Sequence, residues 1–192
     1  MNYKTRVLTT DELKLIINTI KQGFLFKGVK YRPNNKIATA LLLEANLGIR
    51  ISDILNLRLD DIVKDGDRYR LNIVEIKTTK ERSFTVPITI YNFIKLYCLE
   101  NNINPKAKIF PITERAVHKH LKTVCDYLNL KNISTHSFRK FFATQIYINN
   151  NYDVALVCKL LQHASVQTTQ KYIGISEKRI EEALSNHIYL NM

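Results

Sequence analysis

The spacing of apolar residues changes along the chain, and this change limits the possible folds more than any other feature. In the first quarter and again after Pro87, apolar residues recur every three or four positions, as from Leu13 to Ile20, which predicts helices. Residues 59–86 instead contain short runs of strand-forming residues around an Asp65-Gly66 turn, which is typical of antiparallel strands. The sequence therefore predicts a mainly α fold with one small three-stranded antiparallel sheet.

The boundaries of the expected helices follow from caps and breaks. Thr9 or Thr10 can cap the first helix, and Gly48 is expected to end the second, because glycine tolerates the left-handed backbone of a helix end. Gly23 and Gly28 indicate a loose segment between these two helices. The other helices are expected at about residues 35–47, 52–57, 88–100, 113–129, 135–149, 153–162, 165–172 and 177–188.

The charge of the chain indicates a polyanionic partner. Of the 192 residues, 29 are lysine or arginine and 17 are aspartate or glutamate, so the formal net charge is +12. Hydrophobic residues make up 45% of the chain, which is enough for the core of a single domain spanning residues 1–192. Nucleic acid is the first expectation for the partner, an anionic membrane surface the second, and a basic protein without such a partner the third.

The cysteines and the apolar segments favour a soluble protein of a reducing compartment. Cys98, Cys125 and Cys158 are far apart and have no metal-ligand spacing, which favours a cytoplasmic setting. The first ten residues lack the apolar stretch of a signal peptide. The most apolar run, from Ile37 to Leu43, is too short to cross a bilayer.

Two segments in the second half of the chain place histidines near groups that bind or attack phosphate. In HSFRK, His136 and Arg139 share one helical face. Arginine offers a planar fork to two phosphate oxygens, although such a pair also occurs on solvated helix faces. In LLQHASVQTTQKYI, Tyr172 follows His163 within one short segment. The alternative for this segment is a core tyrosine beside a histidine that caps a helix.

Two segments in the first half add further cations. In GIRISDIL, Arg50 lies among apolar residues, where a buried arginine needs a partner such as Asp53. The alternative is a purely structural ion pair between these two residues. In EIKTTKERSFTVPI, Lys77 comes at the tip of a strand, before a short turn. The alternative is an edge lysine that keeps sheets from aggregating.

Taken together, the four segments resemble the tyrosine recombinases of the phage-integrase type. The residues that match this family in order and relative spacing are Arg50, Lys77, His136, Arg139, His163 and Tyr172. The resemblance covers roughly residues 9–172 and implies the family's catalytic-domain fold, which is mostly α with a small sheet. Gln162 departs from the family's usual glycine, and Lys140 and Phe141 replace a commoner histidine and a serine or threonine. Lys80 competes with Lys77 for the hairpin position.

The resemblance implies that the chain cuts and rejoins DNA through a 3′-phosphotyrosine. Tyr172 would attack the scissile phosphate and release a 5′-hydroxyl, and another 5′-hydroxyl would reverse the step. The bond energy is kept in the phosphotyrosine, so neither ATP nor a metal or other cofactor is expected. His136 is the expected acceptor of the Tyr172 proton, and Lys77 is the expected proton donor to the leaving oxygen.

The resemblance also implies which groups hold the phosphate. Arg50 and Arg139 would offset the charge that gathers on it in the transition state. His163 would donate a hydrogen bond to a non-bridging oxygen. Asp53 is expected to hold Arg50 rather than to touch DNA.

Double-stranded DNA is the partner that the resemblance implies, and the remaining cations are candidates for contacts with its backbone. These cations are Lys36, Arg58, Lys80, Arg82, Arg115, Lys119, Lys122 and Lys140. His118 and His120 are expected on a solvated helix face, because residues two apart on a helix point in different directions and do not converge on a metal.

The last segment, about residues 177–188, carries an apolar stripe. We expect it either to pack on its own domain or, as in similar recombinases, to dock on a neighbouring subunit of a homotetramer on DNA. Full-length relatives usually carry a helical core-binding domain that clamps DNA before the catalytic domain, and this sequence is expected to lack it.

Three functions stay open at this point. The first is a site-specific recombinase, such as an integrase, of a phage or other mobile element in the bacterial cytoplasm. The second is a type IB topoisomerase or telomere resolvase, which shares the chemistry but usually has a much larger chain. The third is a non-catalytic DNA-binding protein of the same fold, which the presence of all six reactive groups disfavours.

Overall fold

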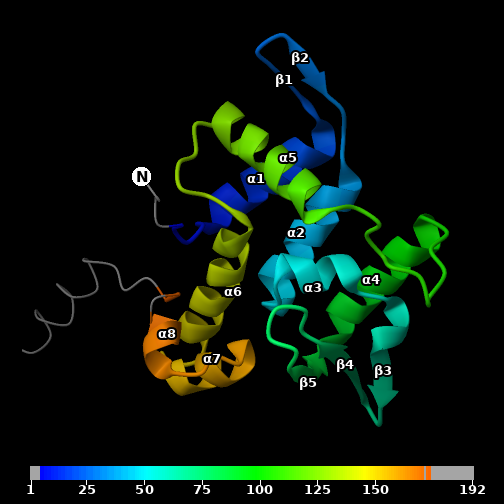
Figure 1. The fold of residues 1–192 in the computed structure, drawn as a ribbon, viewed down its shortest axis with the longest axis vertical. Coiled ribbons are helices and arrows are strands. Elements are labelled where there is room, and N and C mark those ends of the chain that lie inside the picture. Colours follow the sequence, from blue (N-terminus) through cyan, green and yellow to red (C-terminus); the bar gives the residue numbers. More distant parts are fainter. Residues whose placement is uncertain (1–4, 171, 174–192) are drawn as a thin grey trace, which may run out of the picture.

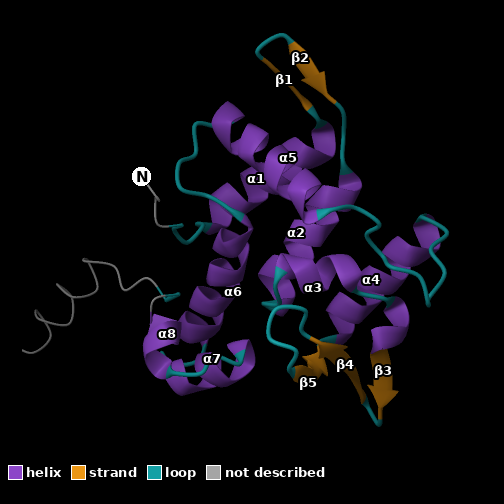
Figure 2. Cartoon of the chain, viewed as in Figure 1, coloured by secondary structure: helices purple, strands orange, loops and turns teal. Residues whose placement is uncertain are grey.

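A computed structural model describes residues 5–170, 172 and 173 of the chain. Its helices are α1 (Thr10–Gln22), α2 (Asn35–Leu47), α3 (Ile51–Asn56), α4 (Ile88–Glu100), α5 (Glu114–Tyr127), α6 (Thr135–Asn149), α7 (Val154–Leu161) and α8 (Val166–Gln170). Its strands are β1 (Phe24–Phe26), β2 (Val29–Tyr31), β3 (Ile62–Asp65), β4 (Arg68–Val74) and β5 (Glu81–Val86), and a 3₁₀ turn η1 (Leu59–Asp61) precedes β3. The predicted mainly α fold with a small three-stranded antiparallel sheet is confirmed (Figures 1 and 2).

Helix α2 lies in the middle of the helical part of the fold, between α1, α3 and α6 (Figure 1). Its residues Ala38, Ala40 and Leu41 have no exposed surface at all. A helix that is apolar on most of its faces must be covered on most of them, and α2 is covered by its three neighbours. This packing therefore fixes the position of Gly48 at the end of α2. It also fixes the start of α3, where the candidate residue Arg50 lies.

The three-stranded sheet has the order β3-β4-β5, with each neighbouring pair antiparallel. Leu71 of β4 pairs with Ile62 on one side and Phe84 on the other, and it is completely buried. This residue anchors the sheet to the core. The long turn between β4 and β5 extends from the sheet toward the helices and carries Lys77.

A second, two-stranded sheet was not predicted. Strands β1 and β2 form a hairpin that projects from the top of the molecule in Figure 1, where the sequence indicated a loose segment. The hairpin is held at its base by a stack of Phe24 on Tyr31, with ring centroids 4.7 Å apart, and by Tyr127 of α5 at 4.8 Å from Phe24. Strands of three residues are too short to show alternation, so the sequence pattern could not reveal them.

The predicted helices agree with the structure within about two residues at each end. Helix α2 ends at Gly48, which adopts the left-handed conformation with φ of 61°. The expected helix at residues 177–188 lies outside the described residues. Among the described helices, none combines the length and the apolar character that a bilayer-spanning segment requires.

Candidate active site

The predicted site residues come from four separate parts of the fold that meet between the sheet and α6–α8. Arg50 precedes α3, Lys77 lies in the β4–β5 turn, and His136 is the second residue of α6. These three side chains line one cleft, together with Ser134 and His118. Residues far apart in the sequence are therefore brought together at one place.

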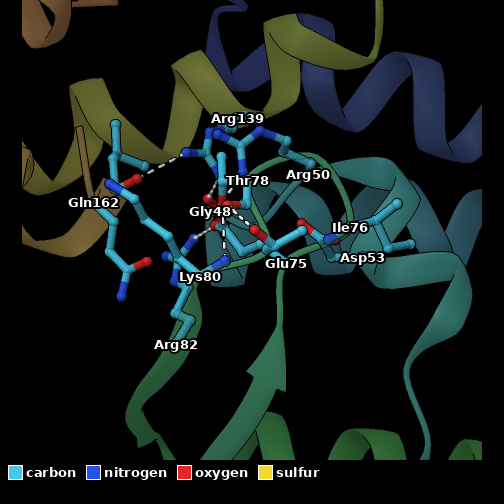
Figure 3. A network of polar contacts seen from close by, with 12 residues as sticks. Gly48, Arg50, Asp53, Glu75, Ile76, Thr78, Lys80, Arg82, Arg139 and Gln162 are labelled. Carbon is cyan, nitrogen blue, oxygen red and sulfur yellow. Dashed lines mark hydrogen bonds and ion pairs between the residues drawn. The ribbon is translucent and has the colours of Figure 1, made fainter. Parts of the chain in front are cut away.

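Arg139 is the most deeply buried member of the set, with 1% of its surface exposed. Its Nη1 donates to the carbonyl of Gly48 at 2.6 Å and its Nη2 to the carbonyl of Leu161 at 3.0 Å. Burial and the nearby charges of Arg82 and Arg50 lower the pKa of Arg139 to about 10, so it remains protonated at neutral pH. This guanidinium joins the end of α2 to the end of α7 and points into the site (Figure 3).

Arg50 is held by a residue that the sequence did not single out. Its Nη1 donates to Oε2 of Glu75 at 2.5 Å. The prediction that Asp53 holds Arg50 is wrong, because Asp53 Oδ1 instead accepts the backbone N–H of Ile76 at 2.9 Å (Figure 3). The Asp53 carboxylate, one helical turn after Arg50, points toward the β4–β5 turn. Glu75 instead contacts Arg50 from the end of β4. Asp53 thus secures the residue just before Lys77.

The predicted DNA-backbone cations fall into two groups. Six of them are exposed, namely Lys36, Arg58, Lys80, Arg115, Lys119 and Lys122. Arg82 is only 3% exposed and forms an ion pair with Glu75 at 3.1 Å, so the prediction that it contacts the DNA backbone is wrong. Its side chain lies on the inward face of β5, where successive side chains alternate between the two faces, and Glu75 compensates its charge inside the protein.

Lys140 is also tied into the fold. It is half-buried, its Nζ donates to the carbonyl of Thr5 at 2.5 Å, and it lies 5.7 Å from the ring centroid of Tyr172. Lys140 therefore lies beside the candidate nucleophile rather than on an open face.

Tyr172 and His163 form the other half of the site. Tyr172 follows α8, its ring is half-buried, and its centroid lies 4.7 Å from that of His163. Nδ1 of His163 lies 3.0 Å from Oγ1 of Thr169, which is completely buried. Thr169 therefore fixes the orientation of the imidazole, a role that its position in the T-T-x-x-Y string gave no reason to expect.

Gln162 reproduces the turn that a glycine would make before His163. It has φ of 52° and ψ of 39°, the left-handed conformation that usually favours glycine. The backbone N–H of His163 still donates to the carbonyl of Cys158 at 3.1 Å. The substitution therefore preserves the turn at the cost of some backbone strain.

One of the two histidines of α5 differs from expectation, because His118 is exposed and His120 is not. His118 lines the cleft and lies 3.3 Å from the Thr135 hydroxyl through its Nε2. His120 is half-buried, and its ring lies nearly perpendicular to those of Phe24 and Tyr31, with ring centroids 6.2 and 6.4 Å away. The prediction that both lie on a solvated face is wrong for His120, because the unpredicted β1–β2 hairpin covers it.

The same two arginines help to lower the pKa of both site histidines. Burial, followed by the positive charge of Arg139 and Arg50, lowers the pKa of His163 to about 4. Partial burial and the charge of Arg139 also lower the pKa of His136, although the residue reaches solvent. Both imidazoles are therefore neutral at pH 7 in the free protein, and both are within the field of one cation cluster.

We expect the stability of the DNA-free chain to depend on His163 in mildly acidic solution. Because its pKa in the folded chain is about 4, below the ordinary 6.5, the unfolded chain takes up the proton first. The free energy of unfolding should be fully maintained above about pH 6.5 and should fall as the pH drops toward about 4. Imidazole NMR titration and urea unfolding measure this, and His163→Gln should flatten the dependence. A His163 midpoint near 6.5 would contradict the expectation.

Comparison with known proteins places the chain in a family. The model of the Phage integrase family matches residues 6–179. The tyrosine recombinase XerC of Caldanaerobacter subterraneus is 27% identical over 191 residues, covering 94% of this chain and 50% of that protein. A probable integrase/recombinase of Acholeplasma phage L2 is 30% identical over 177 residues, covering 88% of this chain and 57% of that protein. The chain thus spans about half the length of these curated relatives.

Solved structures show the same fold. The XerH site-specific recombinase, in a post-cleavage complex with its palindromic difH substrate, matches with a TM-score of 0.71 at 22% identity, over 96% of this chain and 54% of that one. The catalytic domain of bacteriophage HP1 integrase matches with a TM-score of 0.62 at 14% identity, over 98% of both chains. By its sequence and by its fold, the chain belongs to the phage integrase family.

Proposed function

We propose that this chain is a site-specific DNA recombinase that cuts and rejoins strands through a 3′-phosphotyrosine at Tyr172. The observation that carries the proposal is geometric: Arg139 donates to the carbonyls of Gly48 and Leu161. Because Gly48 comes two residues before Arg50 and Leu161 two residues before His163, one guanidinium joins the two halves of the site. A cluster of fixed donors around one point is what a phosphate in its crowded transition state requires.

The proposed steps balance without an added cofactor. The Tyr172 oxygen forms a bond to phosphorus as the bond to the 5′-oxygen breaks, and neutral His136 accepts the phenolic proton. Lys77, in the same cleft as His136, donates a proton to the leaving 5′-oxygen. Attack by another 5′-hydroxyl then reverses the sequence. The phosphodiester energy is retained in the phosphotyrosine.

Arg50 and Arg139 are proposed to bind the non-bridging oxygens, with His163 as a further donor. For neutral His163 to donate through Nε2, the Thr169 hydroxyl has to donate to Nδ1, at the observed separation of 3.0 Å. Once formed, the Tyr172 phenolate would raise the pKa of Arg139. The charges of the phenolate and of the Arg139 guanidinium would therefore attract each other.

Double-stranded DNA is the proposed partner, with cytoplasmic DNA of a bacterium or phage as the setting. The six exposed cations named above are proposed to contact the backbone, which would make affinity fall steeply with salt. Lys122 is partly engaged already, because its Nζ lies 2.8 Å from Asp126 Oδ2. The net charge of +12 supports this partner.

A covalent trap tests the function without a known target site. The chain is incubated with a pool of random-sequence duplexes that carry nicks, so that the short fragment released by cleavage diffuses away. Adducts that survive detergent are isolated, and their DNA is sequenced. Adducts on a shared sequence support a recombinase. Tight binding without any adduct would support a non-catalytic DNA-binding protein, and relaxation of any supercoiled plasmid would favour the topoisomerase.

The tail at residues 177–188 is proposed to join subunits of a homotetramer on DNA. Replacing Ile180 and Leu184 of its apolar stripe by serine should reduce the tetramer to smaller complexes on the trapped sequence, because each change removes apolar contact area. Sedimentation of the protein–DNA complex measures this. The matched control is Glu181→Ser, off the stripe, which should assemble normally. Unchanged assembly of the double variant would exclude docking in trans.

A further inference from the structure

Glu75 is a buried carboxylate in contact with three donors. Its side chain is 2% exposed and lies at the end of β4, between the sheet and α3. Oε2 accepts from Arg50 Nη1 at 2.5 Å and from Thr78 Oγ1 at 2.7 Å, while Oε1 accepts from Arg82 Nη1 at 3.1 Å (Figure 3). Burying a charge in this way is costly unless every oxygen is satisfied, and here both are.

The carboxylate is ionised under ordinary conditions. Burial acts to raise its pKa, but the hydrogen bonds from Thr78 and Arg50 and the charge of Arg50 outweigh burial, so the pKa of Glu75 lies below its usual value. It is therefore an anion set among three guanidiniums, those of Arg50, Arg82 and Arg139. In the free protein it offsets part of the repulsion between them.

Arg82 carries the connection to the other half of the site. Its Nη2 donates to the carbonyl of Leu160 at 2.6 Å, next to the Leu161 carbonyl that accepts from Arg139 at 3.0 Å. These two carbonyls belong to the last turn of α7, directly before the turn that sets His163. The two ion pairs of Glu75 thus link the end of β4, β5, the start of α3 and the last turn of α7.

Arg50 retains donors for a substrate while it is held. Its side chain is 19% exposed and lines the cleft beside Lys77 and His136. In the part of the chain that the structure describes, its only hydrogen-bonded partner is Glu75, through Nη1. The guanidinium is therefore held through one nitrogen, and its other N–H groups make no hydrogen bond within the described residues.

We propose that Glu75 is a positioning residue: it orients Arg50 toward the scissile phosphate and, through Arg82, aligns the end of α7 that carries His163. This inference rests on the proposed recombinase function for its catalytic consequence. The physical gain is preorganisation, because an arginine that is already oriented needs no rearrangement when charge develops on the phosphate.

Side-chain NMR of the DNA-free chain tests the clamp without any chemistry. In protein labelled with ¹⁵N-arginine, rotation of the Arg50 guanidinium about its Nε–Cζ bond should be slow, and the signal is assigned by its loss in Arg50→Lys. Glu75→Gln, which keeps the shape and removes the charge, should make that rotation fast. The matched control is Glu81→Gln, an exposed acid on β5, which should change nothing. Slow rotation retained in Glu75→Gln would overturn the proposal.

Single-turnover cleavage of the trapped DNA sequence tests the catalytic consequence. Glu75→Gln should slow cleavage by about 100-fold, the order expected when a reacting group is displaced by about 1 Å, with DNA affinity unchanged. In an Arg50→Ala background the same change should cost less, because the part of its effect that is exerted through Arg50 is already lost. An equal loss in both backgrounds would overturn the proposal. If the wild-type chain forms no adduct, the recombinase function fails, and the NMR result still decides whether the clamp exists.

A second variant keeps the test informative if Glu75→Gln unfolds because Arg82 is left unpaired. Glu75→Gln combined with Arg82→Met removes the buried pair as a unit, which proteins often tolerate. It should also release Arg50, and restrained rotation of Arg50 in this folded variant would count against the clamp.

Discussion

Replacing Tyr172 by phenylalanine should abolish the covalent protein–DNA adduct and leave DNA affinity unchanged. The substitution removes only the hydroxyl, which is the proposed nucleophile. The ring itself is half-buried and packs in a small cluster with Ala143 and Leu161, and phenylalanine preserves that packing. Because phenylalanine has no oxygen that could attack phosphorus, the rate of adduct formation should fall by at least about 10⁴-fold.

The measurement is a denaturing gel of the adduct beside a filter-binding curve at fixed salt. Tyr127→Phe is the matched control, since this tyrosine lies on α5 against the β1–β2 hairpin, 39% exposed, and takes no part in the site. It should form the adduct at the wild-type rate. An adduct that persists in Tyr172→Phe would assign the nucleophile elsewhere and end the proposed mechanism.

Arg139→Met should damage both stability and catalysis. The guanidinium satisfies the carbonyls of Gly48 and Leu161 in a place with almost no solvent. Methionine fills similar volume but leaves both acceptors without a donor, and each buried unsatisfied acceptor costs about 1–3 kcal/mol. We expect the free energy of unfolding to fall by about 3 kcal/mol and cleavage to slow by about 10³-fold for the lost phosphate donor.

Arg139→Lys separates the two effects. Lysine keeps the charge but cannot reach two carbonyls and a phosphate at once, because it lacks the planar fork. Stability in urea should recover in part, while cleavage should stay low. Arg115→Met, at an exposed cation of α5, should retain the wild-type rate of cleavage once DNA is saturating. Wild-type cleavage by a folded Arg139→Met variant would remove this residue from the site.

The helices were predictable because their signals are local. Apolar spacing, the Thr9 cap and Gly48 each act within a few residues, and the structure confirms α1 and α2 where they indicated. The three-stranded sheet was predictable for the same reason, from alternation and a turn. The β1–β2 hairpin was not, because its strands are three residues long and its stability comes from Tyr127, which is distant in the sequence.

The candidate site was likewise predictable only in part. The types of reactive group and their order were readable from the sequence, since each of the four segments carries its own pattern. The partners of these groups were not. Arg50 pairs with Glu75 and not with Asp53, which is nearer in the sequence. Arg82 is buried and paired rather than free for DNA. Nothing in a single glutamate at the end of a strand marks it as the counter-ion of two arginines.

By itself, then, the sequence determined the helical and strand segments and the chemical groups at hand, because backbone propensity and side-chain chemistry are properties of short stretches. Only the tertiary structure decided which charges are paired, which are buried and which face the cleft. The reason is that the energy of a charge depends on the groups around it and on its distance from water, and in this chain those groups come from α2, β4, β5, α6 and α7 at once.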